Sequence, residues 1–451
     1  MKRNVYLVLA LCFALVALAL PGAGASGKNS IDINVVLNTP VSTAILADLA
    51  RYGTVRDTVA EINAVTMKAP ADQLEVIAAL PYVAAANPDA ERTGSPVDTV
   101  SVTDFAAGLN TWDLDSINVT DLGAGRTIGY DGSGVYVAVL DTGLVDSWRQ
   151  YFPQERIAEE YARSFTGGPV GNVAEQPNKW EHDQDSHGTH VTSTILGFKY
   201  GGGIMNGVAP LATVIPVKVL NQNGSGWTSV IAQGIVYVGN LKAGPLSAFP
   251  VVINMSLGGS ALEAMEKAAI DYAISKGVIV VASAGNNGAA GMGYPGAYAP
   301  VISVAASGWV GEWIGTSWWR LKNVPDPTDP ANFYIADFSS RQKSGQDLDV
   351  AAPGTWIVGP YQVNSGQISY YYLGGTSMAS PHVAGIVALM AQKNPALTAA
   401  QAETILESTA TPLAPGCRNV IDPNTGTYTN ICWGADATGA GLTTADAALV
   451  P

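Results

Sequence analysis

The stretch GTSMASP, residues 375–381, places Ser377 directly before an almost wholly apolar run. That run, Met378–Ala391, predicts a helix that must be buried, because it offers no polar face to water. Ser377 is therefore held at a helix N-terminus, where a free backbone N–H can stabilise developing negative charge. A serine hydroxyl becomes a good nucleophile only with a base in hydrogen-bond reach. Ser377 is thus a candidate nucleophile, which would depend on a basic partner elsewhere in the chain.

Upstream of this stretch, short apolar runs alternate with segments of helical spacing. Uninterrupted apolar runs are typical of strands buried on both faces of a parallel sheet. Their alternation with helices predicts an α/β fold, in which a doubly wound and mostly parallel sheet is flanked by helices. The runs are Val135–Leu140, Val214–Leu220, Val251–Met255, Val278–Ala282 and Val301–Ala306, and the helical segments include Thr228–Leu241, Ala261–Lys276 and Ser377–Lys393.

Polar residues stand where such a sheet collects its reacting groups, beyond the carboxyl ends of the strands. Asp141 is the first polar residue after Val135–Leu140, and Asn286 lies just beyond Val278–Ala282. His187 opens a further helical segment, and Gly188 beside it permits close packing. The strongest polar candidates therefore lie where this architecture places chemistry.

Four short stretches, in the chain order Asp, His, Asn, Ser, together resemble the catalytic stretches of the subtilisin family, the S8 serine peptidases. The resemblance covers most of the chain. It implies a subtilisin-like fold and a serine endopeptidase that needs no cofactor for catalysis. The stretches are VLDTG at 139–143, HGTHV at 187–191, AGNNG at 284–288 and GTSMASP at 375–381.

This resemblance implies a role for each polar candidate. His187 would take the proton of Ser377 and later give it to the leaving amine, while Asp141 would hold the neutral imidazole in place. Asn286 would donate from its side-chain amide to the oxyanion. The implied reaction is hydrolysis of peptide bonds through an acyl-enzyme on Ser377.

The resemblance also implies a cleft in which an extended substrate pairs as an added strand. Small side chains on its walls imply a roomy, apolar primary pocket and broad specificity. Asp183 and Asp185, shortly before His187, would favour basic residues elsewhere in the substrate. The expected lining residues are Ser256, Leu257, Gly258 and Gly259 on one wall, Ala284 and Gly285 on the other, and Gly293 near the floor.

The first residues are typical of a secretory signal peptide. Lys2 and Arg3 precede the apolar run Val5–Leu20, and an A-x-A site ends at Ala25. We therefore expect residues 1–25 to be removed and the protein to be secreted. The run is short for a membrane span, and no other run approaches that length, so no membrane association is expected after removal.

Residues 26–95 read as a separate small α+β domain of three strands and two helices. By resemblance it is an inhibitor-like propeptide, cut from a catalytic domain spanning 96–451 somewhere between Asp89 and Phe105. The exposed linker expected at Thr93–Pro96 is the predicted cleavage region. The predicted elements are strands at Ile31–Leu37, Ile62–Met67 and Val83–Ala86, with helices at Ser42–Tyr52 and Ala71–Leu80.

Charge and cysteine content limit the classes of binding partner that the protein is expected to have. A net charge of −14 argues against nucleic acid, which requires clustered Lys and Arg. The surplus of carboxylates suits either structural calcium, whose ligands stay unnamed, or plain solubility. Removal of the signal peptide leaves Cys417 and Cys432, which predict one disulfide. The expected protein is a monomer whose partners are protein or peptide substrates and its own propeptide.

Other interpretations of the same residues remain open at this point. His187 and His190 with nearby acids could bind a metal, although their i, i+3 spacing lacks the glutamate of H-E-x-x-H. An esterase would require Gly in place of Ala379 and a different chain order. A non-catalytic secreted binding protein on a protease scaffold is a further alternative. His190 and His382 are expected to be structural, and the Trp-rich segment 308–334 to be a self-packed loop rather than a partner-binding surface.

Overall fold

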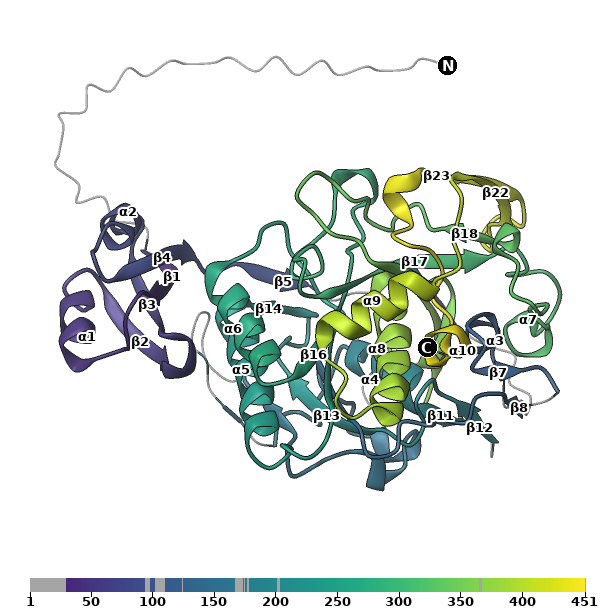
Figure 1. Ribbon diagram of the computed structural model, residues 1–451, viewed down its shortest axis with the longest axis horizontal. Coiled ribbons are helices and arrows are strands. Elements are labelled where there is room, and N and C mark those ends of the chain that lie inside the picture. Colours follow the sequence, from purple (N-terminus) through teal and green to yellow (C-terminus); the bar gives the residue numbers. More distant parts are fainter. Residues whose placement is uncertain are drawn as a thin grey trace, which may run out of the picture.

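The computed structural model describes residues 30–93, 98–101, 110–123, 125–166, 173, 175–176, 178–200, 203–364 and 367–450. The expected signal peptide and most of the expected linker, Thr93–Pro96, lie outside the described residues. The described residues form a small N-terminal unit and a large α/β unit, which lie side by side in Figure 1.

The N-terminal unit is an antiparallel four-stranded sheet of order β2-β3-β1-β4 with two helices. Val35 and Val65 face each other across β1 and β3 and are fully buried. The prediction of three strands missed β2, an edge strand whose sequence TVRDTV is polar and mostly half-buried. The elements are β1 (Ser30–Leu37), α1 (Thr43–Leu49), β2 (Thr54–Val59), β3 (Ala64–Pro70), α2 (Leu74–Ala78) and β4 (Val83–Pro88).

The large unit is built on a sheet of order β10-β13-β9-β15-β16-β17-β18, with β19 also paired to β17. All neighbours run parallel except β17 and β18. The predicted α/β fold class is confirmed. The strands are β9 (Tyr136–Asp141), β10 (Arg163–Ser164), β13 (Thr213–Lys218), β15 (Val251–Met255), β16 (Val278–Ser283), β17 (Ile302–Trp309), β18 (Phe333–Ile335) and β19 (Val350–Pro353).

Helices cover both faces of this sheet. Along β9, Val137 and Val139 pack in the apolar cluster that contains α8, whereas Ala138 and Leu140 pack in the one that contains α5 and α6. Burial on both sides explains why the strands are continuously apolar. The helices are α4 (His187–Leu196), α5 (Thr228–Ala243), α6 (Ala264–Ser275) and α8 (Thr376–Lys393).

Helix α8 starts at Thr376, with Gly375 as its N-cap, so Ser377 lies inside the first turn rather than in front of it. Its residues Thr376–Ala391 are all buried, as the apolar sequence predicts. Neither α8 nor any other helix of the described residues combines the length and apolarity needed to cross a membrane.

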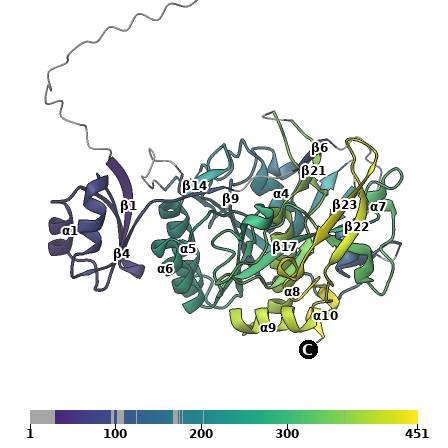
Figure 2. The ribbon, with the colours of Figure 1, turned by 90° about the horizontal axis from the view of Figure 1, so that it is seen from above.

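Smaller elements surround the main sheet. The hairpin β22–β23 lies at the end of the large unit far from the N-terminal unit in Figures 1 and 2. Cys417 and Cys432 are register partners in it and form the predicted disulfide. The smaller elements are β5 (Glu91–Thr93), β6 (Asp98–Ser101), α3 (Trp112–Ser116), β7 (Thr120–Asp121), β8 (Gly125–Arg126), β11 (Gly197–Tyr200), β12 (Gly203–Asn206), β14 (Ser225–Trp227), α7 (Trp318–Leu321), β20 (Ile357–Pro360), β21 (Tyr370–Gly374), α9 (Ala399–Thr409), β22 (Gly416–Ile421), β23 (Tyr428–Trp433) and α10 (Ala445–Leu449).

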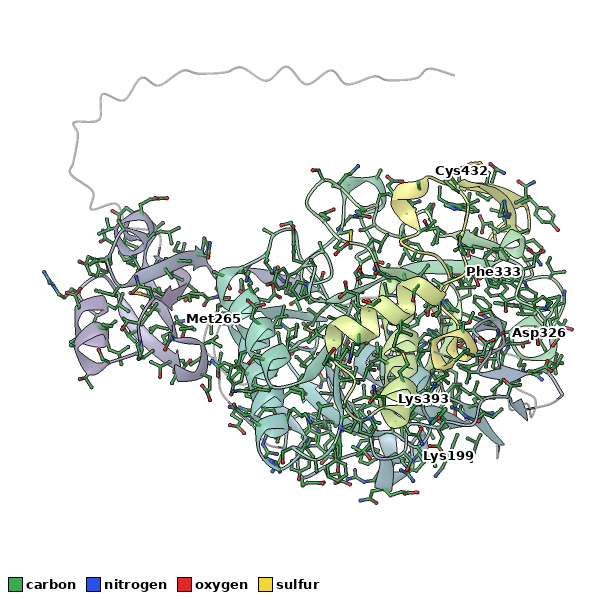
Figure 3. All side chains as sticks on the ribbon, viewed as in Figure 1. Lys199, Met265, Asp326, Phe333, Lys393 and Cys432 are labelled. Carbon is green, nitrogen blue, oxygen red and sulfur yellow. A yellow bond between two sulfur atoms is a disulfide. The ribbon has the colours of Figure 1, made fainter. Side chains whose placement is uncertain are left out.

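The N-terminal unit packs against α5 and α6. Val59 and Ile62 belong to the same apolar cluster as Met265 of α6, which lies near the junction of the two units in Figure 3. Asn240 of α5 donates from Nδ2 to Oε1 of Glu61 at 2.8 Å. The two units therefore share an interface with both apolar and polar contacts.

The Trp-rich segment 308–334 turns its rings inward. Trp318 and Trp319 are buried, and Trp309 stacks on Trp112 with ring centres 6.2 Å apart. Trp313 packs edge-on against Trp356. Trp313 also packs on Trp318 with ring centres 5.5 Å apart, so the segment packs partly on itself, as expected, and partly on Trp112 and Trp356 outside it.

Candidate active site

The side chains of Asp141 and His187 meet where β9 ends and α4 begins. Nδ1 of His187 lies 2.8 Å from Oδ1 and 3.0 Å from Oδ2 of Asp141. Both side chains are 0% exposed. Since a carboxylate only accepts, Nδ1 carries the hydrogen and Nε2 is left as the basic nitrogen of the neutral ring.

Thr142 and two glycines hold this pair in position. Thr142 Oγ1 accepts from the backbone N–H of Gly188 at 2.8 Å and donates to Oδ2 of Asp183 at 2.9 Å. A Cβ on Gly188 would lie 2.5 Å from the carbonyl oxygen of Gly143, so only glycine allows this approach. The turn after β9 is thereby locked to the first turn of α4, as predicted for Gly188.

Burial and nearby charge act on the pKa of His187 in opposite directions. Burial disfavours the imidazolium and lowers the pKa, but the carboxylates of Asp141, Asp185 and Asp183 outweigh it and raise the pKa above its ordinary value. The charged ring is therefore stabilised, which is what a general base needs once it has taken a proton.

Ser377 Oγ is hydrogen-bonded to Ser256 rather than to His187. It donates to the carbonyl oxygen of Ser256 at 3.3 Å, and the Ser377 carbonyl accepts from Ser256 Oγ at 2.8 Å. Among the described residues, Nε2 of His187 is buried and has no hydrogen-bond partner. The structure thus joins Asp141 to His187 and packs α4 on α8, but the expected hydrogen bond between Ser377 and His187 is not formed.

Asn286 has its amide oriented by Thr376. The backbone N–H and Oγ1 of Thr376 donate to Oδ1 of Asn286 at 2.9 and 2.8 Å. Because a backbone N–H can only donate, Oδ1 must face Thr376, which leaves Nδ2 free to donate elsewhere. Gly285, at φ +101°, makes the turn that brings Asn286 here, in a conformation that favours glycine.

A pocket of about 580 Å³ contains Ser377 and Asn286 and most of the predicted lining. Ser256 and Ala284 lie behind this lining and are fully buried. The walls combine small residues with one apolar side chain, Leu257. The lining residues are Thr93, Leu257, Gly258, Gly259, Ser260, Ser283, Gly285, Asn286, Asn287, Gly293, Thr376 and Ser377.

The N-terminal segment enters this pocket as a strand. β5 pairs antiparallel with β14, with Thr93 opposite Ser225. On its other side Thr93 exchanges two backbone hydrogen bonds with Gly258, at 3.1 and 3.0 Å. β5 is therefore the middle strand between β14 and the 256–259 segment, the position that an added substrate strand would take.

The chain continues on the far side of Ser377. β6 pairs antiparallel with β21, and Asp98 is opposite Gly374, three residues before Ser377. Thr93 and Asp98 thus flank the candidate nucleophile, with residues 94–97 between them outside the described residues.

Two buried histidines, His190 and His382, serve the fold. Nε2 of His190 donates to the carbonyl oxygen of Ile357 at 3.1 Å, and burial lowers its pKa to about 3. His382 lies 2.8 Å from the Met378 carbonyl and 3.0 Å from Asp113. The structural role expected for His190 and His382 is confirmed.

The expectation for Asp183 is wrong, and a group of acidic side chains that was not predicted lies elsewhere. Asp183 is only 2% exposed and accepts from Thr142 and the backbone of Asp185, so it cannot meet a basic substrate side chain as expected. Among the described residues, the one group of potential metal ligands is Asp347, Asp349 and Glu403, whose carboxylate oxygens lie within 4.8 Å of one another. It includes none of the histidines.

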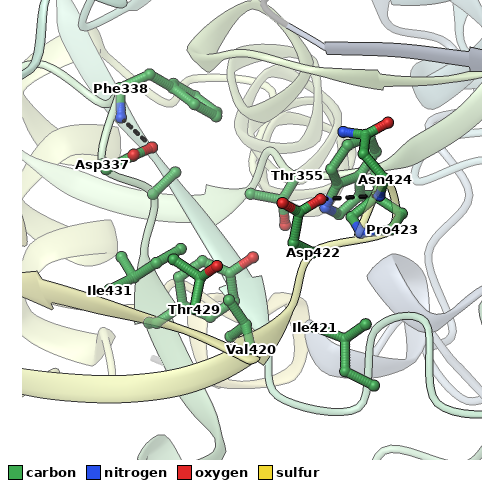
Figure 4. Close-up of a pocket in the computed structure, with 13 residues that line it drawn as sticks. Asp337, Phe338, Thr355, Val420, Ile421, Asp422, Pro423, Asn424, Thr429 and Ile431 are labelled. Carbon is green, nitrogen blue, oxygen red and sulfur yellow. Dashed lines mark hydrogen bonds between the residues drawn. The ribbon is translucent and has the colours of Figure 1, made fainter. Parts of the chain in front are cut away.

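A second pocket, of about 240 Å³, lies beside the β22–β23 hairpin (Figure 4). Its carboxylates are engaged in their own turns: Asp422 accepts from the backbone of Asn424 and Asp337 from that of Phe338, each at 2.8 Å. Its lining includes none of the residues predicted for catalysis or substrate binding.

Comparison with known proteins gives the family. A model of the subtilase family matches residues 132–431, more than half of the chain. Subtilisin DY of Bacillus licheniformis is 36% identical over 289 residues, which cover 63% of this chain and 86% of that protein. The chain belongs to the subtilase family. As a subtilase it is a serine endopeptidase and needs no cofactor for catalysis, so the esterase, metal-hydrolase and non-catalytic interpretations are set aside.

Other subtilases and solved structures are similar over different shares of their length. Subtilisin E of Bacillus subtilis (strain 168) is 38% identical over 287 residues, covering 63% of this chain and 62% of that protein. Fervidolysin from Fervidobacterium pennivorans, described as a keratinolytic enzyme related to subtilisin, shares the fold at a TM-score of 0.66 and 24% identity, covering 95% of this chain and 62% of that chain. Sphericase has a TM-score of 0.54 at 28% identity, covering 75% of this subtilase and 99% of that chain.

Sequence reasoning missed three contributors to the site of this subtilase. Thr376, which orients Asn286, was read only as part of a motif. The strand Ser225–Trp227 was not predicted. Gly224 and Gly226, just before helix α5, could have indicated it, because glycines leave the backbone accessible for pairing. The contact of Arg92 with Glu266 joins residues 174 apart and left no local signal.

Proposed function

We propose that this subtilase is a secreted endopeptidase made as a zymogen, with residues 26–95 as an inhibitory propeptide and 96–451 as the catalytic domain. The observation that carries the proposal is the buried Asp141–His187 pair, together with the pocket lined by Ser377 and Asn286. The signal-like residues 1–25 support secretion.

In the proposed mechanism Ser377 Oγ gives up its hydrogen bond to the Ser256 carbonyl and donates to Nε2 of His187 instead. Catalytic hydrogen bonds are often loose before a substrate is fully engaged. His187 then takes the hydroxyl proton as Oγ attacks the peptide carbonyl, and returns it to the leaving amine. Water repeats the sequence to release the acyl group.

The oxyanion would be held by Nδ2 of Asn286 and the backbone N–H of Ser377. The first-turn N–H groups of a helix have no partner within the helix, so the Ser377 amide is available. Thr376 acts as a positioning residue, because both hydrogen bonds that it donates go to Oδ1 and keep Nδ2 free, while its Oγ1 also accepts from the backbone N–H of Gly285 at 3.1 Å.

The propeptide role rests on how the N-terminal segment is held. β5 takes the position of an added strand, and Asp89 just before it accepts hydrogen bonds from Thr228 and Ser229 at the start of α5. A segment held this way would block other substrates until cut. We place the cut between Thr93 and Asp98, which flank Ser377. The small, partly apolar walls of the pocket support broad specificity at the primary site.

Structural calcium is proposed at Asp347, Asp349 and Glu403. Oδ2 of Asp349 accepts from Ser303, but its buried Oδ1 has no hydrogen-bond partner among the described residues. A hard cation that takes carboxylate oxygens would satisfy this atom. The ion would stabilise the fold and take no part in the reaction.

The test is a single substitution at the nucleophile. Ser377→Ala should leave the precursor at full length and abolish casein hydrolysis, while the control Ser408→Ala, at an exposed serine of α9, should mature normally. N-terminal sequencing of the matured control should begin between residues 94 and 98. Casein hydrolysis by clean Ser377→Ala protein would overturn the proposal.

A further inference from the structure

One ion pair between β5 and the cleft wall is closed to solvent. Arg92, the middle residue of β5, donates from Nε and Nη2 to Oε1 and Oε2 of Glu266 at 3.0 and 2.6 Å. The two side chains are 1% and 0% exposed. Nη2 also donates to the carbonyl oxygen of Ala261 at 2.9 Å. A planar guanidinium matches a carboxylate in this two-bond arrangement, whereas a lysine ammonium would not.

The recess around Arg92 is formed by the large unit. A Cβ on Gly259 would lie 2.4 Å from Nη1 of Arg92, so the absence of a side chain there makes room for the guanidinium. Glu266 is in the first turn of α6, where the helix favours negative charge. Glu263 accepts from the backbone of Met265 and Glu266 and fixes that turn. Each group that contacts the guanidinium, apart from the neighbouring Glu91 carbonyl, remains after the N-terminal segment is cut away.

Backbone pairing fixes which substrate residue reaches this recess. Thr93 exchanges two hydrogen bonds with Gly258, and Arg92 directly precedes it. An extended peptide that pairs with Gly258 in the same way presents its preceding side chain to Glu266. A carboxylate that loses its buried partner is strongly destabilised unless another cation or water replaces it.

We propose that Glu266, Gly259 and the Ala261 carbonyl form a subsite that selects arginine in substrates. The selected position is one residue before the substrate residue that pairs with Gly258, on the acyl side of the scissile bond. This inference rests on the proposed function, since only a peptidase that binds substrates where β5 lies would use the subsite. The primary pocket stays permissive, and the arginine subsite decides where along a polypeptide the cut falls.

The test uses two fluorogenic peptides cleaved by the matured enzyme. One copies residues 88–101, and the other differs only by Arg92→Gln. Charge-assisted hydrogen bonds predict that kcat/KM for the arginine peptide is about tenfold higher or more. Added salt should reduce this ratio, because the empty recess is open to solvent.

A Glu266→Gln enzyme isolates the carboxylate. Its precursor would carry an unpaired, buried Arg92, so it is produced together with Arg92→Gln, which restores a neutral pair. Residue 92 leaves with the propeptide, and the matured enzyme then differs from wild type only at position 266. Asp271→Asn is the matched control, because it removes a carboxylate from the exposed side of the same helix.

We expect the ratio of the two kcat/KM values to fall to near one in Glu266→Gln and to stay high in Asp271→Asn. A wild-type ratio near one, or a high ratio retained in Glu266→Gln, would overturn the arginine subsite while leaving the peptidase intact. Cleavage of neither peptide by the wild type would overturn the proposed function and the subsite with it.

Discussion

At the residue scale, His187, the proposed general base, is predicted to set the pH range in which the enzyme is active. Its neighbouring carboxylates outweigh burial and raise its pKa above the ordinary value of about 6.5. Only the neutral ring can accept a proton, so activity is lost as the pH falls through this raised pKa. We expect the acid limb of a kcat/KM profile, measured from about pH 5 to about pH 9, to have its midpoint above about 6.5. A midpoint clearly below that value would contradict this description of His187.

Asp141→Asn tests the same pair from the other side. An amide can present its NH₂ to Nδ1 and stabilise the wrong tautomer, and it removes the charge that stabilises the imidazolium. We expect kcat to fall by roughly 10⁴, the magnitude known for such a replacement in a serine protease triad. The measurement is steady-state hydrolysis at a pH above the raised pKa, where the wild-type ring is neutral.

Thr376 is predicted to act through Asn286. Thr376→Val removes Oγ1, one of the two donors that keep Oδ1 of Asn286 turned away from the substrate. Losing such an amide donor outright costs about 10² to 10³ in kcat, a range taken from a subtilisin. We therefore expect a smaller loss, about tenfold in kcat with little change in KM. Thr376→Ser keeps the hydroxyl and should be close to wild type, and equal losses in both variants would argue against the positioning role.

Single residues were predictable from the sequence where they belong to a motif. They were not predictable where their role depends on contacts with residues far away in the chain. Asp141 and His187 were predicted and are hydrogen-bonded in the structure. The hydrogen-bond partner of Ser377 could not be predicted, because Ser256 and His187 lie on separate segments of the chain. The burial of Asp183 was also not predicted. Its carboxylate accepts a hydrogen bond from Thr142, and this contact exists only when the two distant segments have folded together.

At the scale of elements, Asp89 is predicted to fasten the N-terminal unit. Helix α5 begins at Thr228, its own N-cap Trp227 supplies no side-chain cap, and Asp89 accepts from the backbone N–H of Ser229 at 3.0 Å. Loss of such a cap costs about 0.5–2 kcal/mol. In a Ser377→Ala precursor, Asp89→Ala should lower the urea concentration at which the N-terminal unit unfolds or detaches, followed by limited proteolysis.

The control for this prediction is Glu75→Ala, which removes an exposed carboxylate of α2 in the same unit. It should leave the urea midpoint near that of the precursor that carries only Ser377→Ala. If Asp89→Ala and Glu75→Ala behave alike, the cap contributes nothing to docking.

Strands of the main sheet were predictable because burial on both faces leaves only apolar residues along them. The edge strand β2 was not, since half-buried polar residues such as Arg56 and Asp57 carry no such signal. The short strands β5 and β14 are strands because they pair with each other. Neither is long enough to show an alternation of apolar and polar residues that would predict the pairing. Helix α8 was predicted to within one residue of its start.

At the scale of the whole molecule, calcium is predicted to raise stability through the cluster Asp347, Asp349 and Glu403. An ion bound only by the folded state at about 100 times its Kd adds about 2.7 kcal/mol, which corresponds to about 3 °C in Tm for a protein of this size. The measurement is the thermal midpoint of the Ser377→Ala precursor in calcium and in EDTA.

Asp347→Asn should abolish most of this difference, whereas Asp271→Asn, outside the cluster, should keep it. Equal thermal midpoints in calcium and in EDTA for the precursor that carries only Ser377→Ala would mean that the three carboxylates hold no structural ion.

The fold class was predictable from the alternation of strands and helices, and the division of the chain at about residue 95 stays a prediction. How the units dock was not predictable, because Val59 and Ile62 read as part of the small unit's own core. The docking matters for function, since it carries β5 into the pocket of Ser377.

The central claim is that Ser377 is a nucleophile activated by His187. Its most direct test is labelling of the matured enzyme with a fluorophosphonate, followed by peptide mapping. The account predicts a single labelled serine, Ser377, and loss of labelling in His187→Ala. Casein hydrolysis by an enzyme whose Ser377 stays unlabelled would contradict it.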